Sequence, residues 1–100
     1  MSNLVLTRKA GTGVRLVIEG RHVFVDTLEV TGGSCKMRVL TLGGQEGIRI
    51  ESVRFRGEMQ IAEGVTVTVL DLAKGHAKLG FEAPRDVQIL RTELIKENEV

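Results

Sequence analysis

The sequence predicts a mainly all-β fold, and three observations support this prediction. Val, Ile and Thr number 13, 6 and 8 among the 100 residues, and their β-branched side chains suit a pleated sheet. Twelve glycines supply the backbone conformations that tight turns need. Short segments with strand patterning alternate with turn signals along the whole chain. We therefore expect residues 1–100 to form a single compact β domain.

Five predicted strands occupy the first half of the chain. Each is rich in apolar and β-branched residues, several with the alternation typical of a strand that buries one face. Most of them end at a turn that contains glycine, and Thr31-Gly32-Gly33 is the clearest hairpin signal. In order, these strands are residues 4–10, 14–19, 22–30, 35–42 and 48–55.

Four further strands are predicted after Gly57. The strongest strand pattern in the chain is VTVTVLDL at residues 65–72. Ala83-Pro84 ends the next strand, because proline cannot donate to the hydrogen-bond ladder. Thr92 is a candidate N-cap, so residues 92–100 are predicted to form a short C-terminal helix or a frayed tail. The four strands are residues 58–62, 65–72, 77–82 and 86–91.

An internal repeat has an offset of 42 residues. Its two parts share a strand, a turn and a second strand, and the flanking strands recur in the same order. The repeat predicts two diverged five-stranded copies, residues 4–51 and 48–94, that join without a linker. The identical pairs are Val23/Val65, Val25/Val67, Leu28/Leu70, Gly33/Gly75 and Lys36/Lys78.

Composition excludes several classes of protein. Lys plus Arg is 14 and Asp plus Glu is 13, which argues against a polycationic nucleic-acid coat but leaves a local basic patch open. No apolar run reaches the length of a membrane helix, and the start lacks a secretion signal. The single cysteine, Cys35, cannot form an internal disulfide and is expected to be a buried thiol in a reducing cytoplasm.

Catalytic chemistry and bound cofactors are not predicted. His22 and His76 have no partners at metal-ligand spacing. Gly11-Thr12-Gly13 is not followed by the Lys of a phosphate loop. No nucleophile has a base at a recognisable spacing. We therefore expect a protein that is not an enzyme and holds no metal or cofactor.

Two motifs at opposite ends of the chain carry a family resemblance. Residues 4–11, LVLTRKAG, resemble the first strand of the CsrA/RsmA carbon storage regulators. Residues 57–94 resemble the central and C-terminal part of that family, through the VTVTVL run, Ala83-Pro84 and the Arg-Asp-Val ending. The chain departs from the family at Leu90, where a histidine is common, and at Thr12-Gly13, which replaces Glu-Thr.

The resemblance implies an intertwined fold and an RNA partner. CsrA-like proteins are homodimers of five-stranded subunits that bind GGA-containing loops of messenger leaders or small regulatory RNAs and regulate translation by steric occlusion. Each RNA site combines the first strand of one subunit with the last strand of the other. Two fused copies would then form a pseudo-dimeric β-sandwich or barrel, as a monomer or a further homodimer.

One intact RNA site and one degenerate site are expected from this arrangement. The intact site would use the first strand, the Ala83-Pro84 loop and the last strand. The degenerate site has lost the Leu-Thr-Arg and Ala-Pro motifs. The residues expected in the intact site are Leu6, Thr7, Arg8, Lys9, Ala83, Pro84, Arg85, Ile89 and Arg91, and those in the degenerate site are Arg49, Arg54 and Arg56.

Two alternatives stay open. The basic residues at the strand ends could be solvated side chains that protect sheet edges, and Arg54 and Arg56 could belong to an amphipathic strand. The chain could also be an RNA-silent relative that acts as a protein-interaction module or as an antagonist of a true regulator. A flagellar assembly factor binds the regulator in that family, which gives a protein partner a precedent.

Overall fold

The computed structural model describes residues 2–43, 47–73 and 75–91, and all regular elements in these ranges are β-strands. The all-β prediction is confirmed, and each strand begins and ends within two residues of its predicted range. The C-terminal helix predicted at residues 92–100 lies outside the described residues. The strands are β1 (Ser2–Lys9), β2 (Gly13–Ile18), β3 (Arg21–Val30), β4 (Ser34–Leu42), β5 (Gly47–Arg54), β6 (Glu58–Ala62), β7 (Val65–Ala73), β8 (His76–Ala83) and β9 (Gln88–Arg91).

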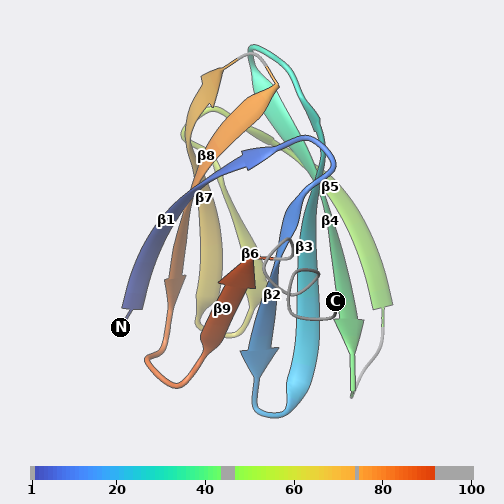
Figure 1. Cartoon of the computed structure of the whole chain (residues 1–100), viewed down its shortest axis with the longest axis vertical. Coiled ribbons are helices and arrows are strands. Elements are labelled where there is room, and N and C mark those ends of the chain that lie inside the picture. Colours follow the sequence, from blue (N-terminus) through green and yellow to red (C-terminus); the bar gives the residue numbers. More distant parts are fainter. Residues whose placement is uncertain (1, 44–46, 74, 92–100) are drawn as a thin grey trace, which may run out of the picture.

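The strands form two antiparallel sheets that exchange strands between the two halves of the chain. One sheet has the order β1-β8-β7-β6, and the other has the order β5-β4-β3-β2-β9. The first strand therefore pairs with the second half, and the last strand pairs with the first half. Figure 1 shows β1 and β5 on opposite sides of the molecule. Among the described residues, no helix is long and apolar enough to cross a membrane.

A single apolar core lies between the two sheets. The strands alternate in burial, as expected for a sheet with one covered face. In β7, Val65, Val67 and Val69 are fully buried. Phe81 and Leu16 have the largest fully buried side chains, and burial of each such residue contributes about 1.5–3 kcal/mol relative to exposure. Both sheets contribute residues to this core.

The strand registers follow the 42-residue offset of the repeat. Lys9 in β1 lies opposite His76 in β8, and Arg54 in β5 lies opposite Ser34 in β4. Since His76 is the repeat counterpart of Ser34, β5 occupies in the five-stranded sheet the position that β1 has in the other sheet. The derivation of this arrangement from two fused subunits stays a prediction.

One strand covers the expected junction between the copies. Residues 47–54 form the single strand β5, which pairs with β4. Arg49 and Arg54 therefore belong to the same strand, and their positions place them on opposite faces of the sheet. No described strand takes the position beside β6 that β9 has beside β2. The four-stranded sheet thus lacks one strand relative to its partner.

Candidate nucleic-acid interface

Among the described strands, none lies beside the outer edge of β1 in the four-stranded sheet. The other edge of β1 pairs with β8 from Ser2↔Ala83 to Lys9↔His76. The carbonyl of Thr7 accepts a hydrogen bond from Arg8 Nε at 2.9 Å, so this carbonyl points to the open edge. Because backbone groups alternate in direction along an antiparallel strand, Val5 and Asn3 present their N–H and C=O groups to the same edge.

The turn after β1 is held firmly in place. Gly11 adopts a φ of 89°, which glycine reaches without a steric cost. The Gly11 N–H donates to the Thr27 carbonyl at 2.7 Å, and Thr27 N–H donates to the Thr12 carbonyl at 2.8 Å. Ala10 N–H donates to the Gly75 carbonyl at 3.2 Å. These bonds fasten the turn to both sheets and fix the end of β1.

A pocket lined by polar and charged residues lies at this corner of the molecule. It has a volume of about 400 Å³ and is lined by Thr7, Arg8, Lys9, Thr12 and His76. The Thr12 hydroxyl donates to the Lys9 carbonyl at 2.8 Å. This bond holds the Thr12 side chain against the end of β1. Thr7 and Lys9 are exposed. The pocket therefore combines positive charge with hydrogen-bonding groups at an open strand edge, which suits an anionic ligand.

Arg8 is buried beneath this corner. Its exposed fraction is 7%, and its guanidinium donates from Nε to Thr7 O at 2.9 Å and from Nη1 to Gly13 O at 3.4 Å. Gly13 has no room for a side chain, since an added Cβ would lie 2.5 Å from the Val25 carbonyl oxygen. Arg8 thus ties β1 to the start of β2 and adds its charge to the pocket from below.

The remaining predicted residues of the first strand and of the Ala-Pro loop have different environments. The Leu6 side chain belongs to the core and is 4% exposed, so only its backbone is available to a ligand. Ala83 is fully buried and Pro84 is half-buried. Ala83 lies opposite Ser2, at the far end of β1 from Arg8, roughly 20 Å away along the strand. The predicted residues therefore follow the length of β1 and do not surround one point.

The last strand approaches this corner through β2. Arg91 lies opposite Val14, the residue next to Gly13, whose carbonyl accepts from Arg8. The backbones of the two predicted strands are therefore brought to the same corner, while the Arg91 side chain lies outside the described part of the chain. Ile89 packs against the core, and Arg85 is exposed in the loop that precedes β9.

The predicted residues of the degenerate site have environments that differ from those of their counterparts at the β1 corner. Val53 stands opposite Cys35 and Arg8 opposite Ala77, so a buried valine occupies the position of Arg8. Arg49 is engaged within the molecule, since its Nη2 donates to Gln60 O at 2.6 Å and its Nε lies 3.0 Å from Glu51 Oε2. Arg54 is exposed. The Arg56 guanidinium lies 5.2 Å from the centre of the Phe55 ring.

Sequence reasoning missed two residues of the corner pocket. From the sequence, Thr12 is considered only within Gly11-Thr12-Gly13 and His76 only as a metal ligand that is excluded, and neither residue is assigned to the site. His76 is half-buried and lies opposite Lys9. The pairing of β1 with β8 brings it there across 66 residues of sequence, and the only signal for that pairing is the family resemblance.

The single cysteine behaves as expected. Cys35 is fully buried, and this burial raises the pKa of its thiol to about 11. A thiol with this pKa carries almost no thiolate at neutral pH, so it is a poor nucleophile. Within the described residues, no group of three His, Cys, Asp or Glu side chains is placed to hold a metal ion.

The chain matches a protein-family model over more than half of its length. Residues 37–99 match the model described as the CsrA global regulator protein family. No solved structure matches the chain.

Curated relatives match shorter segments. The chain is similar to the translational regulator CsrA of Campylobacter jejuni, with 46% identity over 37 residues, which are 37% of this chain and 49% of the relative. It is similar to the same regulator of Thermotoga petrophila, with 49% identity over 44 residues, 44% of this chain and 53% of the relative. The regulator of Clostridium novyi is 40% identical over 47 residues, 46% of this chain and 65% of the relative. The chain thus spans about half the length of several of these relatives.

Proposed function

The chain belongs to the CsrA family of global regulators, and from this we propose that it is a post-transcriptional regulator that binds GGA-containing RNA loops at the β1 corner. The corner pocket carries the proposal, because it joins the side chains of Lys9, Thr7 and His76 to an open strand edge. The curated relatives of this chain are named translational regulators.

RNA loops are read through their exposed base edges, and an edge strand offers backbone donors and acceptors for this purpose. Guanine has a carbonyl acceptor and N–H donors, which complement the free C=O and N–H groups of Val5 and Asn3. Lys9 attracts the phosphates, and Arg8 supports the same charge from its buried position. A loop held here would cover neighbouring nucleotides of a message, which is how binding would regulate translation by steric occlusion.

We further propose one competent site in each chain. The support is the asymmetry between the two equivalent positions. Arg8 is replaced by the buried Val53, and β6 lacks the partner strand that β2 has in β9. The counterpart of the pocket around Lys9 is therefore incomplete beside Arg54.

A gel-shift titration with a GGA hairpin tests both proposals. Lys9→Ala and Arg54→Ala form a matched pair, because both residues are exposed and occupy equivalent register positions. Loss of a charge-assisted contact costs about 1.5–3 kcal/mol, so Lys9→Ala should weaken binding by roughly tenfold or more. Arg54→Ala should bind like the wild type, and a hairpin with an altered loop should bind weakly to all three proteins.

The other outcomes have clear meanings. Equal loss in Arg54→Ala contradicts the proposal of one site. Absence of binding by the wild type favours the second candidate, an RNA-silent relative that binds protein, with a flagellar assembly factor as one candidate partner. The burial of Arg8 and the unpaired edge of β6 favour that candidate.

A further inference from the structure

The edge of β6 is the position at which the two sheets differ. β2 lies between β3 and β9, whereas β6 pairs with β7 alone among the described strands. Val25 lies opposite Val14, and Val67, its repeat counterpart, lies opposite Met59. β6 therefore corresponds to β2 in register, and the strand that would correspond to β9 is missing beside it.

The residues of β5 are consistent with the absence of this neighbouring strand. Arg49 lies opposite Val39 and Leu4 lies opposite Phe81, so Arg49 takes the position of Leu4. By the same register Glu51 takes the position of Leu6. The two leucines contact the core, whereas Arg49 and Glu51 are exposed and form an ion pair. At these two positions the inner face of β5 is thus polar and exposed, whereas that of β1 is apolar and packed against the core.

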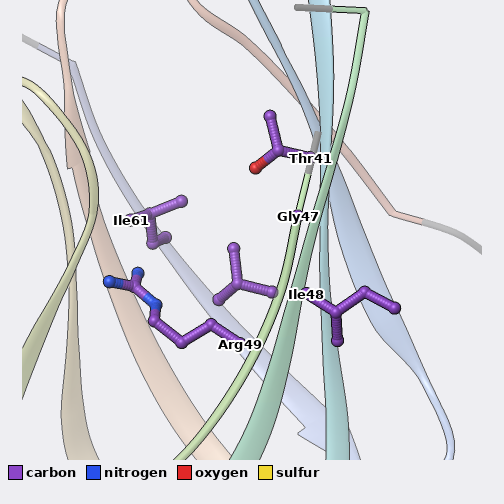
Figure 2. A pocket seen from close by; sticks show the side chains of 6 residues that line it. Thr41, Gly47, Ile48, Arg49 and Ile61 are labelled. Atoms are coloured by element: carbon purple, nitrogen blue, oxygen red, sulfur yellow. The ribbon is translucent and has the colours of Figure 1, made fainter. Parts of the chain in front are cut away.

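A pocket of about 260 Å³ marks the open position. It is lined by Val39, Thr41, Gly47, Ile48, Arg49 and Ile61. Figure 2 shows that Arg49 reaches from β5 toward the side on which Ile61 lies, whereas Ile48 points the other way. The floor of the pocket includes buried aliphatic side chains, since Val39 and Ile61 are 4% and 8% exposed. The pocket has room for an aliphatic side chain from a further strand.

Arg49 covers the hydrogen-bonding edge of β6. Its Nη2 donates to the Gln60 carbonyl at 2.6 Å. Gln60 lies opposite Thr66, and Arg15 lies opposite Phe24, so Gln60 corresponds to Arg15. Arg15 pairs with Leu90 of β9. The Arg49 side chain is therefore hydrogen-bonded to a backbone carbonyl, that of Gln60, to which a neighbouring strand would otherwise bind.

We propose that the β6 edge is a docking site for an extended segment of a partner protein, which adds a fifth strand to this sheet and displaces Arg49. The equivalent position in the same molecule already holds a strand, β9, which shows what fits. The partner segment would run antiparallel to β6 and carry aliphatic residues at alternate positions, as β9 and the residue before it do with Val87 and Ile89. Strand addition of this kind gains backbone hydrogen bonds from the edge and specificity from the alternate side chains.

The charges at the ends of β6 favour some occupants of this edge over others. Glu58 and Glu63 are exposed at the two ends of β6. Antiparallel pairing with the β6 strand of a second copy would bring these like charges close together, which is unfavourable. A segment with basic residues at its ends is complementary, and residues 85–91 have this pattern, since Arg85 and Arg91 flank the apolar positions. In this chain that segment is already engaged, since β9 pairs with β2. We therefore assign the edge to a basic-flanked aliphatic strand of a partner protein.

A peptide with the sequence of residues 85–91, capped at both ends, is the probe for this site. Its affinity is measured by fluorescence anisotropy, and the contact is mapped by amide chemical shifts in the full chain. The matched control is the same peptide N-methylated at the amides that would pair, which keeps the side chains but removes the donors. We expect the unmodified peptide to shift amides of β6 and the methylated peptide to bind at least tenfold more weakly.

The variant Arg49→Ala separates displacement from simple contact. Removal of a competing hydrogen bond should tighten peptide binding by roughly two- to tenfold, while loss of a direct contact would weaken it. Absence of binding, equal binding of the methylated peptide, or shifts confined to β2 would each overturn the proposal. Concentration-dependent self-association that is abolished by the peptide would assign the edge to a second copy and would also overturn it.

Discussion

Substitution of Arg8 tests whether this residue supports the fold beneath the proposed RNA site or acts as an exposed ligand. Arg8 is 7% exposed, and its guanidinium links Thr7 O to Gly13 O. Arg8→Ala removes two methylenes beyond Cβ, at about 0.8 kcal/mol each. It also removes the short bond to Thr7, which contributes about 1.5 kcal/mol for a charged donor. The expected loss in the free energy of unfolding is therefore about 3 kcal/mol.

Thermal and urea unfolding measure this loss. For a domain of about this size, a change of 1 kcal/mol shifts Tm by about 4–8 °C, so Arg8→Ala should lower Tm by roughly 12–24 °C. Lys9→Ala is the matched control, since it removes an adjacent positive charge from an exposed side chain. Its effect on stability should stay within about 0.5 kcal/mol, whereas the proposed function predicts that it weakens RNA binding.

The pair of variants has a result that would refute this reasoning. If Arg8→Ala unfolds at the same temperature as Lys9→Ala, the Arg8 guanidinium does not support the fold. Arg8 would then be a solvated side chain at a strand edge, and a loss of RNA affinity in Arg8→Ala would report a direct contact.

The further predictions concern the stability and reactivity of three residues. Gly13→Ala should cost about 1–3 kcal/mol in urea unfolding, because the new Cβ would meet the Val25 carbonyl oxygen at 2.5 Å; an unchanged midpoint would contradict this. Cys35, whose pKa burial raises to about 11, should react with a thiol reagent at pH 8 at least a hundredfold more slowly in the folded chain than in urea, and equal rates would disprove its burial. Because the folded state keeps this thiol protonated, the free energy of unfolding should also fall as pH rises from 9 to 11, and Cys35→Ala should remove that part of the pH dependence. Arg38→Ala breaks a partly exposed ion pair with Asp26 at 2.8 Å and should cost less than about 1 kcal/mol, so a larger loss would show that the pair is better shielded than its exposure indicates.

Much of the local structure could be predicted from the sequence. The strand patterns and glycine turns locate all nine described strands within two residues, because strand alternation and turn chemistry are local properties. The burial of Cys35 also follows from its place in an alternating strand and from the small residue, Ala77, at its repeat counterpart. The candidate site was predicted only in part, since its residues come from strands that are distant in sequence.

The environment of individual side chains could not be predicted. Arg8 and Lys9 are adjacent basic residues, yet one is buried and the other exposed, because successive residues of a strand point to opposite faces. The expectation drawn from the family resemblance places both residues in the RNA site. His76 enters the pocket through its pairing with Lys9, and this long-range register leaves no local pattern.

By itself, the sequence determined the fold class, the order of the strands and the 42-residue repeat, since each of these depends on neighbouring residues and their periodicity. Only the tertiary structure decided which half of the chain each strand pairs with, that β5 takes the position equivalent to β1, and that β7 is the one neighbour of β6 among the described strands. The physical reason is that one strand cannot fill two positions. Residues 47–54 complete the five-stranded sheet through β4, and the neighbouring position beside β6 is covered by the Arg49 side chain.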